Sequence, residues 1–161
     1  MKYTIRKSED IDETREMHQL AFPDDVWVGD DHEYWFAYDE DGATCGFASA
    51  ICYAESNTVY LSRCAVSMAA NGKGLQRRFI AVRLRWARSI SADVAFTYTK
   101  LKNYPSMINL IRAGFKLFDT NDKLTGWREY HCFVKDLRKR STAEMFRKLS
   151  EKLAEEFNDK P

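Results

Sequence analysis

The segment Leu61-Ser-Arg-Cys-Ala-Val66 leads through Ser-Met-Ala-Ala into Asn71-Gly72-Lys-Gly74, and it is the most informative part of this chain. It begins as an apolar strand and continues, after the glycines, as a helix with apolar residues at helical spacing: Leu75, Phe79, Val82, Trp86 and Ile90. A strand, a glycine turn and a helix N-terminus in this order present unpaired backbone N–H groups, which attract phosphate together with the helix dipole. The segment therefore predicts a phosphate-binding loop.

Two common phosphate ligands do not fit this loop. A dinucleotide-binding loop requires a third glycine, where this chain has Arg77. A nucleoside triphosphate loop requires Ser or Thr after Gly-Lys, where this chain has Gly74. Taken alone, the glycines are also compatible with a simple turn that opens a helix.

Strands and helices can be assigned outward from the loop. On its N-terminal side we expect strands at 3–6, 34–38, 44–54 and 58–66, with a hairpin turn at 39–42. We also expect a helix that starts near Ile11, ends near Pro23 and is capped by Ser8-Glu9-Asp10. On its C-terminal side we expect strands at 94–98, 115–118 and 130–134 and a helix at 103–113. Pro105 suits the first turn of that helix, and Gly114 suits its C-terminus.

The last residues predict a separate helix. Ser141 and Glu144 form a capping box, and Leu149, Leu153 and Phe157 follow on one face. We expect a domain at 1–137 and a helical extension at 138–161, packed on the domain or on a partner. A homodimer through this helix is one arrangement that the pattern allows.

Composition excludes several classes of protein. The 161 residues are 45% hydrophobic, enough for one core, and the net charge of +1 argues against a nucleic-acid-coating protein. No apolar run is long enough to span a bilayer, and the first residues lack an apolar signal core, so we expect no signal peptide. The four cysteines and three histidines lack metal-ligand spacing, so we expect no metal and reduced cysteines in a cytoplasmic protein.

A second motif indicates which phosphate ligand the loop would bind. Asn103-x-x-Ser106 lies on the helix that ends at Gly114-Phe115, one strand beyond the glycine loop. With Ala65-Val66 and Gly72-x-Gly74, this order and spacing resemble the GNAT superfamily of acetyltransferases. The resemblance implies an α/β (α+β) fold, with a mixed, mostly antiparallel sheet of six to seven strands flanked by helices. It also implies that the protein transfers an acetyl group from acetyl-coenzyme A (acetyl-CoA) to an amine.

The resemblance further implies a cofactor site and an acceptor site. The glycine loop would bind the diphosphate of coenzyme A (CoA), and the preceding strand would pair with the pantetheine arm; the second helix would add two contacts. By position these cofactor residues are Cys64, Ala65, Val66, Ser67, Asn71, Gly72, Lys73, Gly74, Leu75, Asn103 and Ser106. An acidic segment with two tryptophans would hold a cationic acceptor, through Asp24, Asp25, Trp27, Asp30, Asp31 and Trp35. A solvated acidic loop is the alternative reading of that segment.

The catalytic residues are less clear than the cofactor site. Ala69, Leu110 and Ser62 replace an Arg or Gln, a tyrosine acid and a glutamate base that many members carry. A primary amine has a pKa of about 10.4 and must lose a proton before it attacks, so a base is required. The candidates for proton transfer are Glu33, Ser62, Tyr98 and Tyr104, with Tyr130 as a further phenol.

Two other functions remain open on the sequence alone. The missing acid and base would suit a GNAT-like CoA-binding or degenerate module that acts through protein contacts. Five arginines on the helix after the glycine loop would suit RNA, although helical spacing distributes them around the helix: Arg77, Arg78, Arg83, Arg85 and Arg88.

Overall fold

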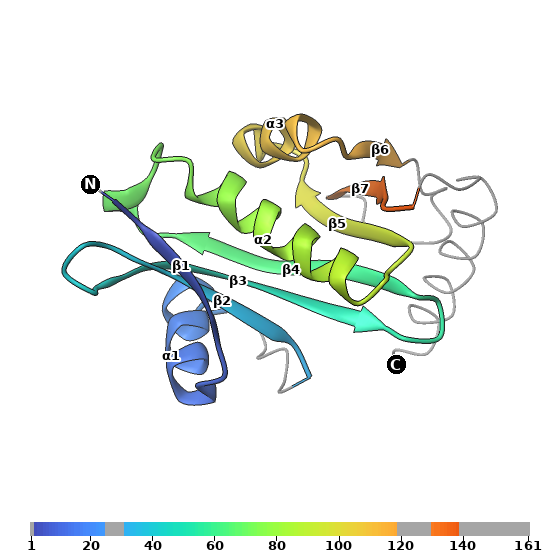
Figure 1. The fold of residues 1–161 in the computed structure, drawn as a ribbon. Coiled ribbons are helices and arrows are strands. Elements are labelled where there is room, and N and C mark those ends of the chain that lie inside the picture. The colour runs from blue at the N-terminus through green and yellow to red at the C-terminus, as the bar shows by residue number, and fades with distance from the viewer. Residues whose placement is uncertain (1, 25–30, 119–129, 139–161) are drawn as a thin grey trace. The chain divides into compact units, whose positions relative to one another are not determined.

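The computed structural model describes residues 2–24, 31–118 and 130–138 (Figure 1). Within them the elements are β1 (Thr4–Ser8), α1 (Ile11–Ala21), β2 (Glu33–Tyr38), β3 (Thr44–Tyr53), β4 (Thr58–Val66), a 3-10 turn η1 (Met68–Ala70), α2 (Leu75–Ser89), β5 (Val94–Lys100), α3 (Tyr104–Arg112), β6 (Lys116–Phe118) and β7 (Tyr130–Asp136). The element order expected from the sequence is confirmed, with boundaries that differ by a few residues. The expected helix from Ser141 lies outside the described residues.

The strands form one sheet in the order β1-β2-β3-β4-β5-β7-β6. The pairs β1–β2, β2–β3, β5–β7 and β6–β7 are antiparallel, whereas β4 and β5 are parallel. The parallel ladder joins Thr58–Tyr60 to Val94–Phe96. The mixed, mostly antiparallel sheet expected from the sequence is therefore confirmed, and it has seven strands in the described part of the chain.

The chain divides into two compact units, which are described separately. The first unit comprises Met1–Ile51 and Leu61–Arg83, and the second comprises Cys52–Tyr60 and Leu84–Pro161. The glycine loop and the part of β4 that precedes it both belong to the first unit.

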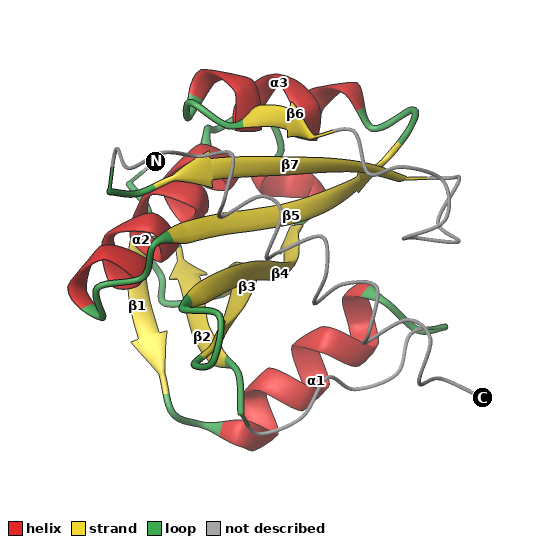
Figure 2. Ribbon diagram, turned by 90° about the vertical axis from the view of Figure 1, so that its right-hand side faces the viewer, coloured by secondary structure: helices red, strands yellow, loops and turns green. Residues whose placement is uncertain are grey.

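Helix α1 covers one face of the sheet in the first unit. Tyr34, Phe36 and Phe47 form a buried cluster, and Met17 and Phe22 pack against it from α1 and its C-terminal end. Figures 1 and 2 show α1 beside β2 and β3. The α1 N-terminus is fixed as the sequence suggests, because the side chain of the N-cap residue accepts hydrogen bonds from two backbone N–H groups of the first turn.

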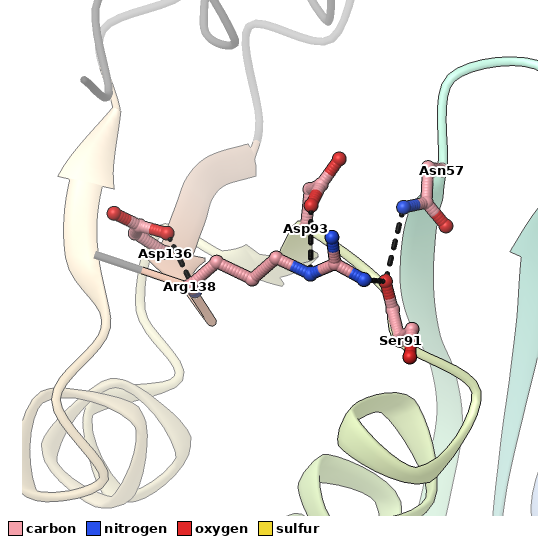
Figure 3. A network of polar contacts seen from close by, with 5 residues as sticks. All are labelled: Asn57, Ser91, Asp93, Asp136 and Arg138. Atoms are coloured by element: carbon pink, nitrogen blue, oxygen red, sulfur yellow. Dashed lines mark hydrogen bonds and ion pairs between the residues drawn. The ribbon is translucent and has the colours of Figure 1, made fainter. Parts of the chain in front are cut away.

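The second unit has an aromatic core and a polar network. Phe96 stacks on Tyr60 with ring centroids 5.1 Å apart, and these rings pack with residues of β7. Arg138 lies just beyond β7; its Nε is 3.0 Å from Asp93 Oδ1, and its guanidinium also donates to the Ser91 carbonyl (Figure 3). Asn57 donates to that same carbonyl at 3.0 Å. Arg138 was the first residue of the expected extension, and its side chain is bonded to residues of this unit.

Candidate functional site

The glycine loop has the backbone conformation that its sequence suggests. Gly72 and Gly74 have φ angles of +73° and +77°, in the left-handed region that favours glycine. A Cβ at either position would meet no atom within 4 Å. The two glycines are therefore required by backbone conformation and not by lack of space.

Not every amide in the loop is available to a ligand. The N–H groups of Asn71 and Lys73 donate to Met68 and Ala70 carbonyls, at 3.2 and 3.3 Å. The expectation that all five backbone positions bind the diphosphate is therefore corrected for these two. Their hydrogen bonds shape the turn, so their amides are already engaged.

The remaining loop amides suit an anion. Among the described residues, the N–H groups of Gly72, Gly74 and Leu75 have no hydrogen-bond partner. Leu75 opens α2, a helix of 15 residues, where N–H groups are unpaired and the dipole favours negative charge. Lys73 and Arg77 are exposed beside these amides. Three unengaged donors and two cations fit the diphosphate of CoA.

Successive backbone N–H groups of β4 point in opposite directions, either toward β3 or away from it. Ser67 N–H donates to the Cys45 carbonyl at 2.8 Å, and Arg63 N–H donates to Ser49 Oγ at 3.1 Å, so both amides face β3. Because alternate residues of a strand bond to opposite sides, the amides of Cys64 and Val66 point away from β3.

This alternation leaves two of the four β4 residues expected to contact the pantetheine arm. Cys64 and Val66 remain candidates for pairing with the pantetheine arm, because their amides point away from β3. We call this side of β4 the pantetheine edge. Ser67 does not, because its N–H is bonded to β3 and its carbonyl accepts from Ala70 at 3.1 Å. Ala65 shares the β3-facing register and lies against Gly46, so its expected role is corrected as well.

Gly46 allows β3 to approach β4 closely beside this edge. A Cβ built on Gly46 would lie 2.5 Å from the Ala65 carbonyl oxygen and 3.0 Å from Val66 Cα. Real Cβ atoms do not approach backbone atoms this closely, so a side chain here must displace β4.

We expect Gly46→Ala to destabilise the protein by about 1–3 kcal/mol, the usual range for overpacking a buried site. It should also weaken CoA binding, because the displaced strand carries the Cys64 and Val66 amides. Urea unfolding and calorimetric titration with CoA measure the two effects. A variant with unchanged stability and unchanged affinity would contradict the close approach.

A buried arginine supports the same region from α2. Arg83 is only 3% exposed, and its guanidinium donates to the Ser49 carbonyl at 3.1 Å and to the Phe79 carbonyl at 3.2 Å. Ser49 therefore accepts from Arg83 through its carbonyl and from the Arg63 amide through its hydroxyl. Through these two contacts Arg83 is linked to the backbone of β4 next to Cys64.

Several proton-transfer candidates have positions that disfavour the role. Glu33 pairs with Lys7 at 2.7 Å, and Tyr104 is an exposed residue on α3. Burial raises the pKa of Tyr98, and Cys132 and Tyr60 beside it raise the pKa further, so this phenol holds its proton tightly. Ser62 Oγ is buried without a hydrogen-bond partner among the described residues. A hydroxyl with no base beside it is not activated.

The expected acceptor residues are only partly described. Asp24 and Asp31 are exposed, and the side chain of Asp31 is 69% accessible. Trp35 is buried at 6% exposure within β2, which corrects its expected role as a cover for the substrate stem. Asp25, Trp27 and Asp30 lie outside the described residues.

His32 is a residue that the sequence analysis did not single out. Its Nδ1 lies 3.1 Å from Asp31 Oδ1, and its side chain is 8% exposed. Burial lowers the pKa of His32, and Arg63 lowers it further against the opposing effect of Asp31. A histidine next to an acidic residue was the available signal, but only the fold brings Arg63 of β4 close to it.

Asn103 and Ser106 are confirmed as the start of α3. The Asn103 side chain accepts from the Ser106 N–H at 3.3 Å, which is an ordinary helix cap. These residues belong to the second unit, and a cofactor contact for them stays a prediction.

The arginines of α2 do not form one exposed patch. Arg83 is buried, and Arg78 donates to the Tyr3 carbonyl at 2.8 Å, whereas Arg77, Arg85 and Arg88 are exposed. The basic surface that would bind RNA is thus smaller than the sequence suggests. In the described part of the chain, no helix is both long and apolar enough to cross a membrane, and no cluster of side chains could hold a metal ion.

Comparisons with known proteins give a family match and solved structures with a similar fold. The profile of the acetyltransferase (GNAT) family matches residues 3–115. A search of curated proteins found no match.

Solved structures with the same fold include an acetyltransferase from Bacillus subtilis in complex with CoA, at 18% identity and a TM-score of 0.71, covering 84% of this chain and 99% of that one. The yncA protein of Salmonella typhimurium, solved with acetyl-CoA, is 19% identical with a TM-score of 0.67, covering 88% and 97% of the two chains. The spermidine/spermine N-acetyltransferase SpeG from Vibrio cholerae is 12% identical with a TM-score of 0.70, covering 86% and 96%.

Proposed function

Since this chain belongs to the GNAT family of acetyltransferases and acetyl-CoA is its cofactor, we propose that it acetylates a primary amine by direct attack in a ternary complex. The observation that carries the proposal is the set of unengaged N–H groups at Gly72, Gly74 and Leu75. Such a set at a helix N-terminus is a binding site for phosphate groups.

Two sets of backbone amides in the first unit would bind two parts of CoA, the diphosphate and the pantetheine arm. Gly72, Gly74 and Leu75 would hold the diphosphate, with Lys73 and Arg77 as nearby cations. The amides of Cys64 and Val66 would hold the pantetheine arm as an added strand does. One of these amides would also donate to the oxygen of the acetyl carbonyl, where negative charge develops during acyl transfer. Acetyl-CoA supplies the acetyl group as a reactive thioester.

Direct attack is favoured over an acyl-enzyme. Cys64 is the cysteine on the proposed pantetheine edge. Burial raises the pKa of the Cys64 thiol, and the nearby Arg83 lowers it by less. A thiol that keeps its proton is a poor nucleophile. The acceptor amine itself is therefore the proposed nucleophile.

A cationic acceptor is supported by charge. Asp24 and Asp31 are exposed acids of the first unit, in the region where the acceptor was expected. A fold shared with the Vibrio cholerae spermidine/spermine N-acetyltransferase makes polyamines natural first probes. A protein lysine or N-terminus has the same ammonium chemistry and belongs in the same panel.

The test is thiol release from acetyl-CoA in the presence of spermidine, an aminoglycoside, a lysine peptide and a peptide with a free N-terminus. We expect at least one amine to raise thiol release well above the amine-free rate, with the acetylated product seen by mass spectrometry. Calorimetry with CoA runs in parallel. Tight CoA binding without transfer to any amine would favour the non-catalytic binding module over an enzyme.

A further inference from the structure

We infer that His32, oriented by Asp31, is the general base that removes the proton from the acceptor amine. This inference rests on the proposed function and adds a residue that the family motifs did not indicate. The residues that support it all belong to the first unit: Asp31, His32, Tyr34, Ser49, Arg63 and Cys64.

The contact with Asp31 determines which nitrogen of His32 carries the proton. A carboxylate only accepts hydrogen bonds, so His32 Nδ1, 3.1 Å from Asp31 Oδ1, must be the donor. The lone pair then lies on Nε2, which has no hydrogen-bond partner among the described residues. A neutral imidazole held in this tautomer by a carboxylate is the arrangement that histidine bases use.

The sheet places His32 on the side of the molecule where the Arg63 side chain lies. Tyr34 pairs with Ser49 across β2 and β3, and Ser49 Oγ accepts from the Arg63 amide on β4. These three residues thus form one row across the sheet. His32 lies two residues before Tyr34, its ring centroid 6.2 Å from that of Tyr34, and close enough to Arg63 for the guanidinium to act on its pKa.

This row connects the segment that carries His32 to the proposed acetyl position. Arg63 immediately precedes Cys64, whose amide lies on the proposed thioester edge. Two strand spacings of about 4.8 Å separate β2 from β4. His32 lies two residues outside this row, so a proton from an amine at this edge would pass to Nε2 through water molecules.

Charged and titratable groups around His32 set its protonation state. Asp31 and Tyr34 come from its own segment and Arg63 from β4, while the neighbouring Glu33 is paired with Lys7 of β1. Burial, the largest effect, and Arg63 both lower the pKa of His32, and Asp31 opposes them. The imidazole is therefore neutral near pH 7 and can accept a proton.

The chemical step balances with His32 as the acceptor of one proton. The ammonium form of the substrate gives a proton to Nε2, and the freed lone pair forms the C–N bond at the acetyl carbonyl carbon. The C–S bond breaks, and its electron pair leaves on the sulfur of CoA. The second proton from nitrogen goes to solvent, and the proton on His32 goes to the thiolate or to solvent, which regenerates the neutral base.

The first experiment compares His32→Gln and His32→Ala with His131→Gln, a control at a half-buried histidine of β7 in the other unit. We expect kcat with the best amine of the panel to fall about 100-fold or more in both His32 variants, the usual contribution of a positioned base. CoA affinity by calorimetry should stay within twofold of wild type. Added imidazole should restore part of the kcat of His32→Ala, which a purely structural role would not allow.

The second experiment follows the pH dependence of kcat. Activity should rise with pH as His32 loses its proton. Asp31→Asn removes a group that raises the pKa of His32, so its rise should move to lower pH, whereas Arg63→Gln should move it to higher pH. The ionisation of the amine substrate affects variant and wild type equally. Its effect therefore cancels when the two rates are divided at each pH.

The outcomes separate this inference from the proposed function. An active wild type whose His32→Gln variant keeps its kcat, or whose His32→Ala variant is not rescued by imidazole, overturns the role of His32 alone. A wild type that binds CoA but acetylates no amine overturns the proposed function and the role of His32 with it.

Discussion

Replacing Gly74 with aspartate is expected to weaken CoA binding by about 100-fold, or about 2.7 kcal/mol. The residue has a φ angle of +77°, which costs a non-glycine residue roughly 1–2 kcal/mol. Aspartate tolerates this region better than most residues, so the fold should survive. Its carboxylate would face the diphosphate next to the unengaged amides of Gly74 and Leu75, and like charges repel. Isothermal calorimetry with CoA measures the loss.

Gly42→Asp is the matched control for this variant. Gly42 has a φ angle of +84° in the turn between β2 and β3, and a Cβ there also meets nothing within 4 Å. Both substitutions add a negative charge at a residue with a positive φ angle, so both should lower the melting temperature. Only Gly74→Asp should lose CoA. Equal affinity for CoA in the two variants would show that the loop does not bind the diphosphate.

Arg83→Met is expected to lower the free energy of unfolding by about 2–4 kcal/mol. Hydrogen bonds to a charged group contribute about 1.5–3 kcal/mol each, and a buried acceptor that loses its donor incurs a desolvation penalty. The Ser49 carbonyl would lose the Arg83 guanidinium in a fully buried position. Methionine keeps much of the side-chain volume, so the loss reports on the guanidinium rather than on a cavity.

Arg85→Met on the same helix is the control. Arg85 is exposed, and surface substitutions usually change stability by no more than about 0.5 kcal/mol. Denaturant unfolding of both variants provides the comparison. Equal stabilities would show that the Arg83 contacts contribute nothing. Arg83 is bonded to Ser49, which in turn is bonded to the Arg63 amide of β4. A lower kcat in Arg83→Met at unchanged CoA affinity would therefore show that these contacts position the β4 backbone for the reaction.

Much of the fold followed from the sequence because its signals are local. The apolar strands, the helix cap within 8–10 and the glycine turn at 72–74 each depend on neighbouring residues, and each was predicted correctly in type. The position of the glycine loop followed for the same reason. Its individual amides did not, because the turn bonds of Asn71 and Lys73 depend on the exact path of the chain.

The sequence on its own determined the order of strands and helices, the family and the position of the glycine loop, since all of these are encoded by the spacing of nearby residues. Only the tertiary structure decided which groups are buried, which are paired and which stay unengaged. It buried Trp35 and Arg83, paired Glu33 with Lys7, and brought His32 to Arg63, a residue 31 positions away in the chain. Such contacts depend on strand register and burial, which act between residues far apart in sequence.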